Sequence, residues 1–140
     1  MRKFGLTQDK KTLIIWPESI VDKNLRFDGK IVAGMNSYFW GNVECKNAFF
    51  AKGCSVNGVI KCRKAVLGAY MRFNRVEASG DVIIMDGCVG EYVKALGNVR
   101  IGNARVNTVE ADGIVVIDGT ARLGKLLAKK VIAVNINERF

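Results

Sequence analysis

Six segments of the chain superimpose at a spacing of 16 or 17 residues, and their apolar and small positions stay aligned throughout. Each segment begins with an apolar residue and has a small residue two positions later. Three residues then follow, and after them come two apolar or small residues that are again two positions apart. The segments begin at Val43, Ile60, Val76, Val93, Val109 and Leu126. A short fixed period indicates a repeat architecture in which each unit stacks on the next.

Apolar residues two positions apart have the side-chain period of a β-strand. A third pair of alternating residues lies upstream in each segment, so each repeat contains three short strands. Glycine, asparagine and aspartate gather between them, as in Asp86-Gly87, Gly102-Asn103 and Asp118-Gly119, where the chain turns sharply. We therefore expect an all-β fold, a single parallel β-helix of six triangular coils. Parallel crossovers favour the right-handed form.

The repeat also sets the expected domain organisation. A chain of 140 residues is long enough for one domain. We expect residues 31–135 to form the β-helix, with a partial coil around Phe27, Ile31 and Ala33. Residues 1–30 are expected to be an N-terminal segment that is either flexible or packed along the rod, and residues 136–140 a short tail.

Composition argues against an enzyme, a cofactor site or a metal site. The chain has no histidine, which is the commonest general base and metal ligand. The acidic residues near corners form no visible pair that could serve as a catalytic set. The four cysteines fall in inward columns, Cys45 with Cys62 and Cys54 with Cys88, and lack the close spacing of a zinc site. Free thiols and the lack of a signal peptide lead us to expect a cytoplasmic protein.

The outward residue of the first strand alternates in charge from one coil to the next. The column is Glu44, Lys61, Glu77, Lys94, Glu110 and Leu127. Opposite charges on adjacent parallel strands favour this register, since a slip of one coil would align like charges. The alternation stops at Leu127, in the last coil.

The outward residues of the second strand are mostly apolar and define what we call the predicted stripe. It consists of Val32, Phe50, Leu67, Ile83 and Val116. An apolar strip of this length is expected to be covered or to form an interface. One alternative is intramolecular cover by the N-terminal residues Leu13, Ile14, Ile15 and Trp16; the other is contact with another rod or with a membrane, for which the same four residues are the candidate anchor.

The C-terminal end of the rod lacks a polar cap, because only six residues follow the last coil and they end in a phenylalanine. Soluble solenoids need such caps to prevent stacking. The sequence therefore predicts end-to-end self-association through apolar residues of this end. The candidates are Leu123, Leu126, Leu127, Ile132, Val134 and Phe140.

The V-x-A-x-x-x-V-x-I units between Gly34 and Val134 resemble those of the bactofilins, a family of polymer-forming bacterial cytoskeletal proteins. The similarity is greatest from Gly97 to Asn135. The resemblance implies a right-handed β-helix, filaments that form without bound nucleotide, and the inner membrane face or cell-wall-related proteins as partners. It also implies polymer contacts at the first coil, near Phe39 and Val43. The longer, basic N-terminal segment and the missing proline-rich tail depart from the family pattern.

Two other classes of protein share features with this sequence. The left-handed β-helix of hexapeptide acyltransferases has longer, more even coils and uses a histidine base, which this chain lacks. The second class is a β-helical module for an anionic partner, a polysaccharide, a lipid or a nucleic acid, through its apolar stripe and its basic surface, since the net charge is +9. The basic candidates are Lys61, Arg63, Lys64, Arg72 and Arg75. Nucleic acid is the weakest of these because no binding motif accompanies the basic residues.

Overall fold

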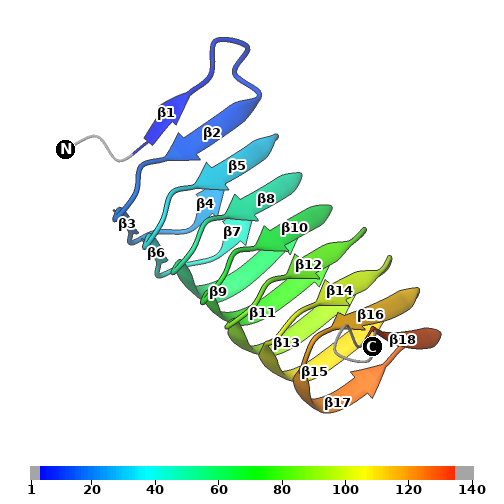
Figure 1. Cartoon of the computed structure of the whole chain (residues 1–140). Coiled ribbons are helices and arrows are strands. Elements are labelled where there is room, and N and C mark those ends of the chain that lie inside the picture. The colour runs from blue at the N-terminus through cyan, green and yellow to red at the C-terminus, as the bar shows by residue number, and fades with distance from the viewer. Residues whose placement is uncertain (1–3, 135–140) are drawn as a thin grey trace.

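The structure is a computed structural model that describes residues 4–134, and all of their regular elements are strands. The strands stack in parallel into a β-solenoid, with β1 at one end and β17 and β18 at the other (Figure 1). This confirms the all-β solenoid predicted from the repeat. The stack has about seven coils instead of six, because the chain forms a complete coil before the first predicted one.

One side of the rod is a sheet that we call sheet A, and every coil contributes one strand to it. Its order along the rod is β1 (Phe4–Leu6), β2 (Thr12–Ile15), β5 (Lys30–Ala33), β8 (Asn47–Phe50), β10 (Lys64–Leu67), β12 (Val82–Ile84), β14 (Val99–Ile101), β16 (Ile114–Asp118) and β18 (Lys130–Val134). Every neighbouring pair is parallel except β1 and β2, which form an antiparallel hairpin.

The remaining strands form the bent sheet B. Its main path is β3 (Ile20–Val21), β6 (Tyr38–Phe39), β9 (Ser55–Cys62), β11 (Arg72–Ala78), β13 (Val89–Ala95), β15 (Arg105–Ala111) and β17 (Arg122–Leu127), with β4 (Leu25–Arg26) and β7 (Val43–Glu44) beside it. The first half of β9 pairs with β6 and its second half with β7. From β9 onward the two predicted strands on this side are therefore one continuous strand that bends at a corner.

The core consists of the inward side chains of successive coils. In the central coils Val76, Val93 and Val109 are each fully buried, as the repeat predicts. Phe39 and Phe50 pack edge to face within this core, with ring centroids 5.7 Å apart. Because each coil buries its apolar residues only against its neighbours, stability depends on contacts between adjacent coils.

Corner side chains connect each coil to the next through the backbone. Asn98 donates its N–H to Asp81 Oδ1 at 2.8 Å, and its own Oδ1 accepts the Ile114 N–H at 2.8 Å. Gly97 and Gly113 precede the two donors, and a Cβ at either would collide with the accepting side-chain oxygen. Asn24, Asn42, Asp86 and Asn103 make the same kind of bond at other corners. Glycine beside an Asx residue thus allows adjacent corners to approach closely.

The N-terminal segment is part of the solenoid, which corrects the expectation that residues 1–30 are flexible or lie along the rod. Leu13 pairs with Ile31, Ile20 with Tyr38 and Leu25 with Val43 in parallel ladders. These pairs are 18 residues apart, so this coil does not fit a repeat of 16 or 17. The β-helix therefore begins at β2, well before residue 31; residues 135–140 lie outside the described chain.

Candidate assembly surfaces

Within residues 4–134, no strand packs on the core beyond the last coil of the solenoid. Val131 and Ala133 of β18 continue the inward columns of Val115 and Ile117. Val115 is fully buried, yet Val131, one coil further, is 45% exposed. Removing an apolar side chain from water is favourable in proportion to the area buried. The last strand of sheet A thus presents core residues to whatever lies beyond it.

The other residues predicted at this end fall into three groups. Leu123 and Leu126 are half-buried against the core, whereas Leu127, Ile132 and Val134 are exposed. Ile132 pairs with Val116, so it lies in an outward column and not in the core column assigned by the repeat. Phe140 lies outside the described residues. The predicted C-terminal residues that the structure describes therefore lie together on the last coil.

The N-terminal end is more closed. Leu13 and Ile15 belong to the first coil but are only 5% and 1% exposed. The hairpin strand β1 lies beyond β2 and pairs with it residue by residue. Four exposed apolar side chains mark this end: Phe4, Leu6, Trp16 and Ile20. The repeat could not identify them because they precede it.

Phe39 and Val43, implied as polymer contacts by the family resemblance, are not at an end. They are 1% and 0% exposed and lie in the second coil, with β3 and β4 stacked on them. This prediction was wrong because the coil before them was missed.

The candidate membrane residues are divided between core and surface. Leu13 and Ile15 are core residues, whereas Ile14 is half-buried on the outer side and Trp16 is exposed. Strand alternation imposes this division, so the four do not form one contact surface and do not cover the predicted stripe. No helix of sufficient length and apolarity to cross a membrane is found in residues 4–134.

The predicted stripe is only partly correct. Phe50 and Leu67 are buried at 3% and 0%, and their neighbours Phe49 and Val66 face outward instead. The corner after Cys45, like that after Cys62, has two residues before the next buried position, whereas the corner after Ala78 has three. A one-residue difference moves every side chain of a strand to the opposite face.

The corrected column, which we call the sheet A stripe, runs the length of the rod. Paired positions give Ile14, Val32, Phe49, Val66, Ile83, Arg100, Val116 and Ile132. Arg100 is the only charged member, and its guanidinium pairs with Asp118 at 2.6 Å. The Lys30 ammonium lies 4.5 Å from the centre of the Phe49 ring.

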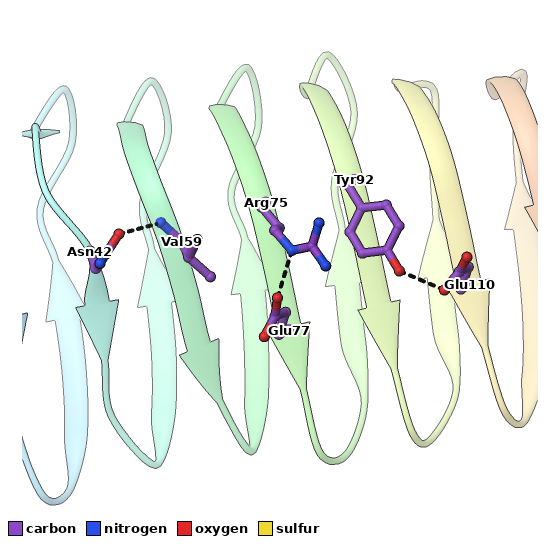
Figure 2. Close-up of polar contacts among 6 residues, drawn as sticks. All are labelled: Asn42, Val59, Arg75, Glu77, Tyr92 and Glu110. Carbon is purple, nitrogen blue, oxygen red and sulfur yellow. Dashed lines mark hydrogen bonds and ion pairs between the residues drawn. The ribbon is translucent and has the colours of Figure 1, made fainter.

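The outer surface of sheet B carries the alternating charges in the predicted register. Glu77 is opposite Lys61 and Lys94, and Arg26 extends the column by pairing with Glu44 at 3.4 Å. The shortest contacts run along the strand and diagonally, however, as Figure 2 shows. Arg75 bonds Glu77 at 2.6 Å, and the Tyr92 hydroxyl donates to Glu110 at 2.5 Å.

The same two pairs are linked to each other. The Arg75 guanidinium lies 4.1 Å from the Tyr92 ring centre. The hydrogen bond to Glu110, followed by burial, raises the pKa of Tyr92 because the carboxylate disfavours a tyrosinate. The bond to Glu77 similarly raises the pKa of Arg75. The contacts of Tyr92 with Arg75 and Glu110 link neighbouring coils, whereas Arg75 and Glu77 lie on one strand. These half-buried contacts fix register more than they stabilise the fold.

The five basic candidates do not form one site. Lys64 lies on sheet A, Arg63 at a corner, and Lys61, Arg72 and Arg75 on sheet B. A different set is aligned: Arg105 is directly opposite Arg122, and Arg72 lies two strands away in the same column. All three are exposed. Like charges on adjacent strands repel each other, which favours an anion over this column.

The cysteines are free and belong to the interior. Cys54 and Cys88 are buried, and their thiols donate to the carbonyls of Gly34 and Gly68 at 3.2 and 3.1 Å. Burial raises the pKa of Cys45 and of Cys62 to about 12, and that of Cys88 to about 11. Within the described chain there is no cluster of three or more potential metal ligands.

Comparison of the chain with protein-family models, with curated proteins and with solved structures finds no match. Three features of the rod can support a function: its apolar C-terminal coil, its apolar sheet A stripe and its charged sheet B surface.

Proposed function

We propose that this chain is a structural protein that assembles end to end into filaments without a nucleotide. The observation that carries the proposal is the open core of the last coil, where Val131 is exposed although the equivalent Val115 is fully buried. Soluble solenoids cover a terminal coil with polar residues, whereas the described part of this last coil presents apolar ones.

The terminal strands supply main-chain bonding as well as apolar area. In residues 4–134, β17 and β18 are the last strands of their sheets and pair on one side only. Their outer N–H and C=O groups can accept another strand, as in recognition by strand addition. Apolar contact at Leu127 and Val131 would exclude water from those bonds. Assembly through this end would continue the solenoid from one subunit into the next.

The resemblance of the repeats to bactofilins agrees with this proposal and extends it. A cytoskeletal scaffold in the cytoplasm, at the inner membrane face and in contact with cell-wall-related proteins, is the role that the resemblance suggests. The membrane part would need a surface other than Leu13 and Ile15, which are in the core. Ile14 and Trp16 remain candidates on the outer side.

The proposal is tested with two lysine variants of the last coil, Leu127→Lys and Val131→Lys. Leu127→Lys places a lysine opposite Glu110, which continues the charge alternation within the subunit. Both variants are expected to remain folded and to shorten filaments seen by negative-stain electron microscopy and sedimentation. The matched control is Val89→Lys, at a residue of similar exposure (40%) in the middle of sheet B.

Long filaments in both end variants would contradict assembly through the last coil. Loss of filaments in the Val89→Lys control as well would point to a general effect of added charge, which would also count against the proposal. Circular dichroism of each variant establishes that the solenoid has formed.

A second candidate function, binding of an anionic polymer, is favoured by the column of Arg72, Arg105 and Arg122. Its arginines repeat along the rod at multiples of the strand spacing of about 4.8 Å, so a linear polyanion could contact several of them. The double variant Arg105→Gln/Arg122→Gln should weaken binding of an acidic polysaccharide and reduce its salt dependence. Unchanged binding and salt dependence would reject this candidate.

A further inference from the structure

The outer face of sheet A presents the sheet A stripe between two other columns. The strands that form it lie side by side along the rod (Figure 1). On one side the paired residues are Thr12, Lys30, Asn47, Lys64, Asp81, Asn98, Ile114 and Lys130. On the other side the third column consists of Trp16, Gly34, Ala51, Gly68, Met85, Gly102, Asp118 and Val134. Four of these residues are small, and Trp16, Met85 and Val134 are exposed.

The face is apolar along its centre and close to neutral there. Ile83 and Ile132 are 39% and 38% exposed, and the rest of the apolar stripe is half-buried. Asp118 neutralises Arg100. A partner that buries the sheet A stripe therefore gains apolar contact without isolating the Arg100 charge, whose burial unpaired would be costly.

We propose that the partner is a second copy of this chain, packed sheet A against sheet A with the two rods antiparallel. The two-fold axis lies between β10 and β12, the fourth and fifth of the eight parallel strands. In this arrangement each strand faces the one in the mirror position of the order. Val66 of one copy then faces Ile83 of the other, and Val32 faces Val116.

The same arrangement makes the charged column complementary. Lys64 faces Asp81 of the other copy, on both sides of the axis. Within the stripe Arg100 faces Phe49, so a cation meets an aromatic ring whose centre already lies 4.5 Å from the Lys30 ammonium of its own copy. In the third column Met85 faces Gly68, so a protruding side chain meets a position without one.

Other arrangements lose this complementarity. Moving the axis onto β10 places Lys64 against Lys64, and moving it onto β12 places Asp81 against Asp81. Parallel rods place Arg100 against Arg100 and leave Lys64 opposite Gly68 of the third column. Like charges across an interface disfavour the wrong register. Charge and shape thus select the antiparallel, central arrangement.

The size of the face limits the strength of the pair. Eight strands at about 4.8 Å and a width of about four residues at 3.3 Å give roughly 510 Å² per copy. A standard interface buries about 800 Å² per partner. Isolated rods should therefore pair weakly, whereas rods already joined end to end would pair along their whole length and gain from multivalency. This length dependence rests on the proposed function; the pairing itself does not.

Cross-linking tests the pairing in the Leu127→Lys background, where end-to-end contacts are blocked. Single variants Val32→Cys and Val116→Cys, one carrying a larger tag, are mixed and treated with a short bismaleimide at pH 7. Antiparallel rods bring the two cysteines together and give heterodimers. Val32→Cys alone should give almost none, because its two copies would be about 24 Å apart. The native thiols react slowly because burial raises the pKa of Cys45 and Cys62 to about 12.

Sedimentation equilibrium provides a second measurement in the same background. Ile83→Lys occurs twice in each pair, next to the axis, and should weaken dimerisation at least tenfold. Val89→Lys on sheet B, of equal exposure, should leave it unchanged.

Three results would overturn the pairing: homodimers of Val32→Cys as the main product, no cross-linked dimer at any concentration, or equal dimerisation of Ile83→Lys and the control. Heterodimers in a protein whose unblocked form makes no filaments would refute the proposed function and leave the pairing intact. Filaments of the unblocked protein without heterodimers would refute the pairing and leave the proposed function intact.

Discussion

The contact between Asn98 and Gly113 gives a quantitative test of how coils are held at their spacing. A Cβ added at Gly113 would overlap Asn98 Oδ1 and would stand 2.9 Å from the Gly97 carbonyl oxygen. Asn98 Oδ1 accepts the Ile114 N–H, and the Gly113 N–H donates to the Gly97 oxygen at 3.0 Å. Gly113→Ala must therefore displace the asparagine and disturb a backbone bond.

The magnitude follows from those two contacts. Losing one hydrogen bond costs about 1 kcal/mol, and distorting the backbone bond adds a similar amount, so Gly113→Ala should lower the free energy of unfolding by about 2 kcal/mol. Asn98→Ala removes the same side-chain bond and should cost about 1 kcal/mol. The double variant should cost about 2 kcal/mol and not about 3, because the first substitution has already removed the obstructing oxygen.

Urea unfolding followed by circular dichroism and by fluorescence of the two tryptophans measures these values. Gly5→Ala is the control, since a Cβ there meets nothing closer than Trp16 at 3.5 Å; its effect should be small. Strict additivity of Asn98→Ala and Gly113→Ala would show that the two residues are not in contact and would refute the account of the corners.

Three further predictions concern the core and the charged surface. Phe39→Ala should lower the free energy of unfolding by about 3–5 kcal/mol, because Phe39 is a core residue; a change in filament length at unchanged stability, measured by urea unfolding and electron microscopy, would contradict this. Burial raises the pKa of Cys45 and Cys62 to about 12, so their reaction with a thiol-specific disulfide reagent at pH 8 should be at least about 100-fold slower in the folded than in the unfolded protein; equal rates would refute their burial. The pKa of Tyr92 is raised by its hydrogen bond to Glu110, so its bond stabilises the fold below the ordinary tyrosine pKa and is lost as the pH rises through the folded value. Ultraviolet titration should show a lower Tyr92 pKa in Glu110→Gln, with Tyr92→Phe identifying the signal, and an unchanged titration would show that the bond is absent.

The sequence predicted the solenoid and most of its central coils because the buried residues before and after each corner are apolar or small and recur at a regular spacing. Val76, Ala78, Val82 and Ile84 are buried as their spacing requires. The charge alternation gave the correct register of sheet B, since opposite charges identify neighbouring coils.

The errors arose where the length of a corner changed. Two-residue corners after Cys45 and Cys62 shifted Phe50 and Leu67 into the core, and no side chain in the corner signals the difference. The first coil was missed because its neighbours are 18 residues away. Spacing therefore identifies a solenoid reliably but fixes the inward face of each strand only when corner lengths are known.

The sequence does not predict the contacts of Tyr92 with Arg75 and with Glu110 either. Column order places these residues on neighbouring strands, but the diagonal contacts depend on side-chain conformation. Charge opposite charge was the simpler expectation. The structure shows instead that Glu77 bonds to Arg75 two positions earlier on its own strand.

The subunit spacing along a filament tests end-to-end assembly most directly. Sheet A has nine strands from β1 to β18, so a continuous ladder between subunits requires a spacing of about 43 Å per subunit with a strand repeat of about 4.8 Å along the filament axis. Electron microscopy of filaments with layer-line analysis measures both. A spacing of about 43 Å together with the 4.8 Å axial repeat is the predicted result; a protein that remains monomeric at high concentration, or filaments whose strands do not lie across the axis at that repeat, would contradict the account.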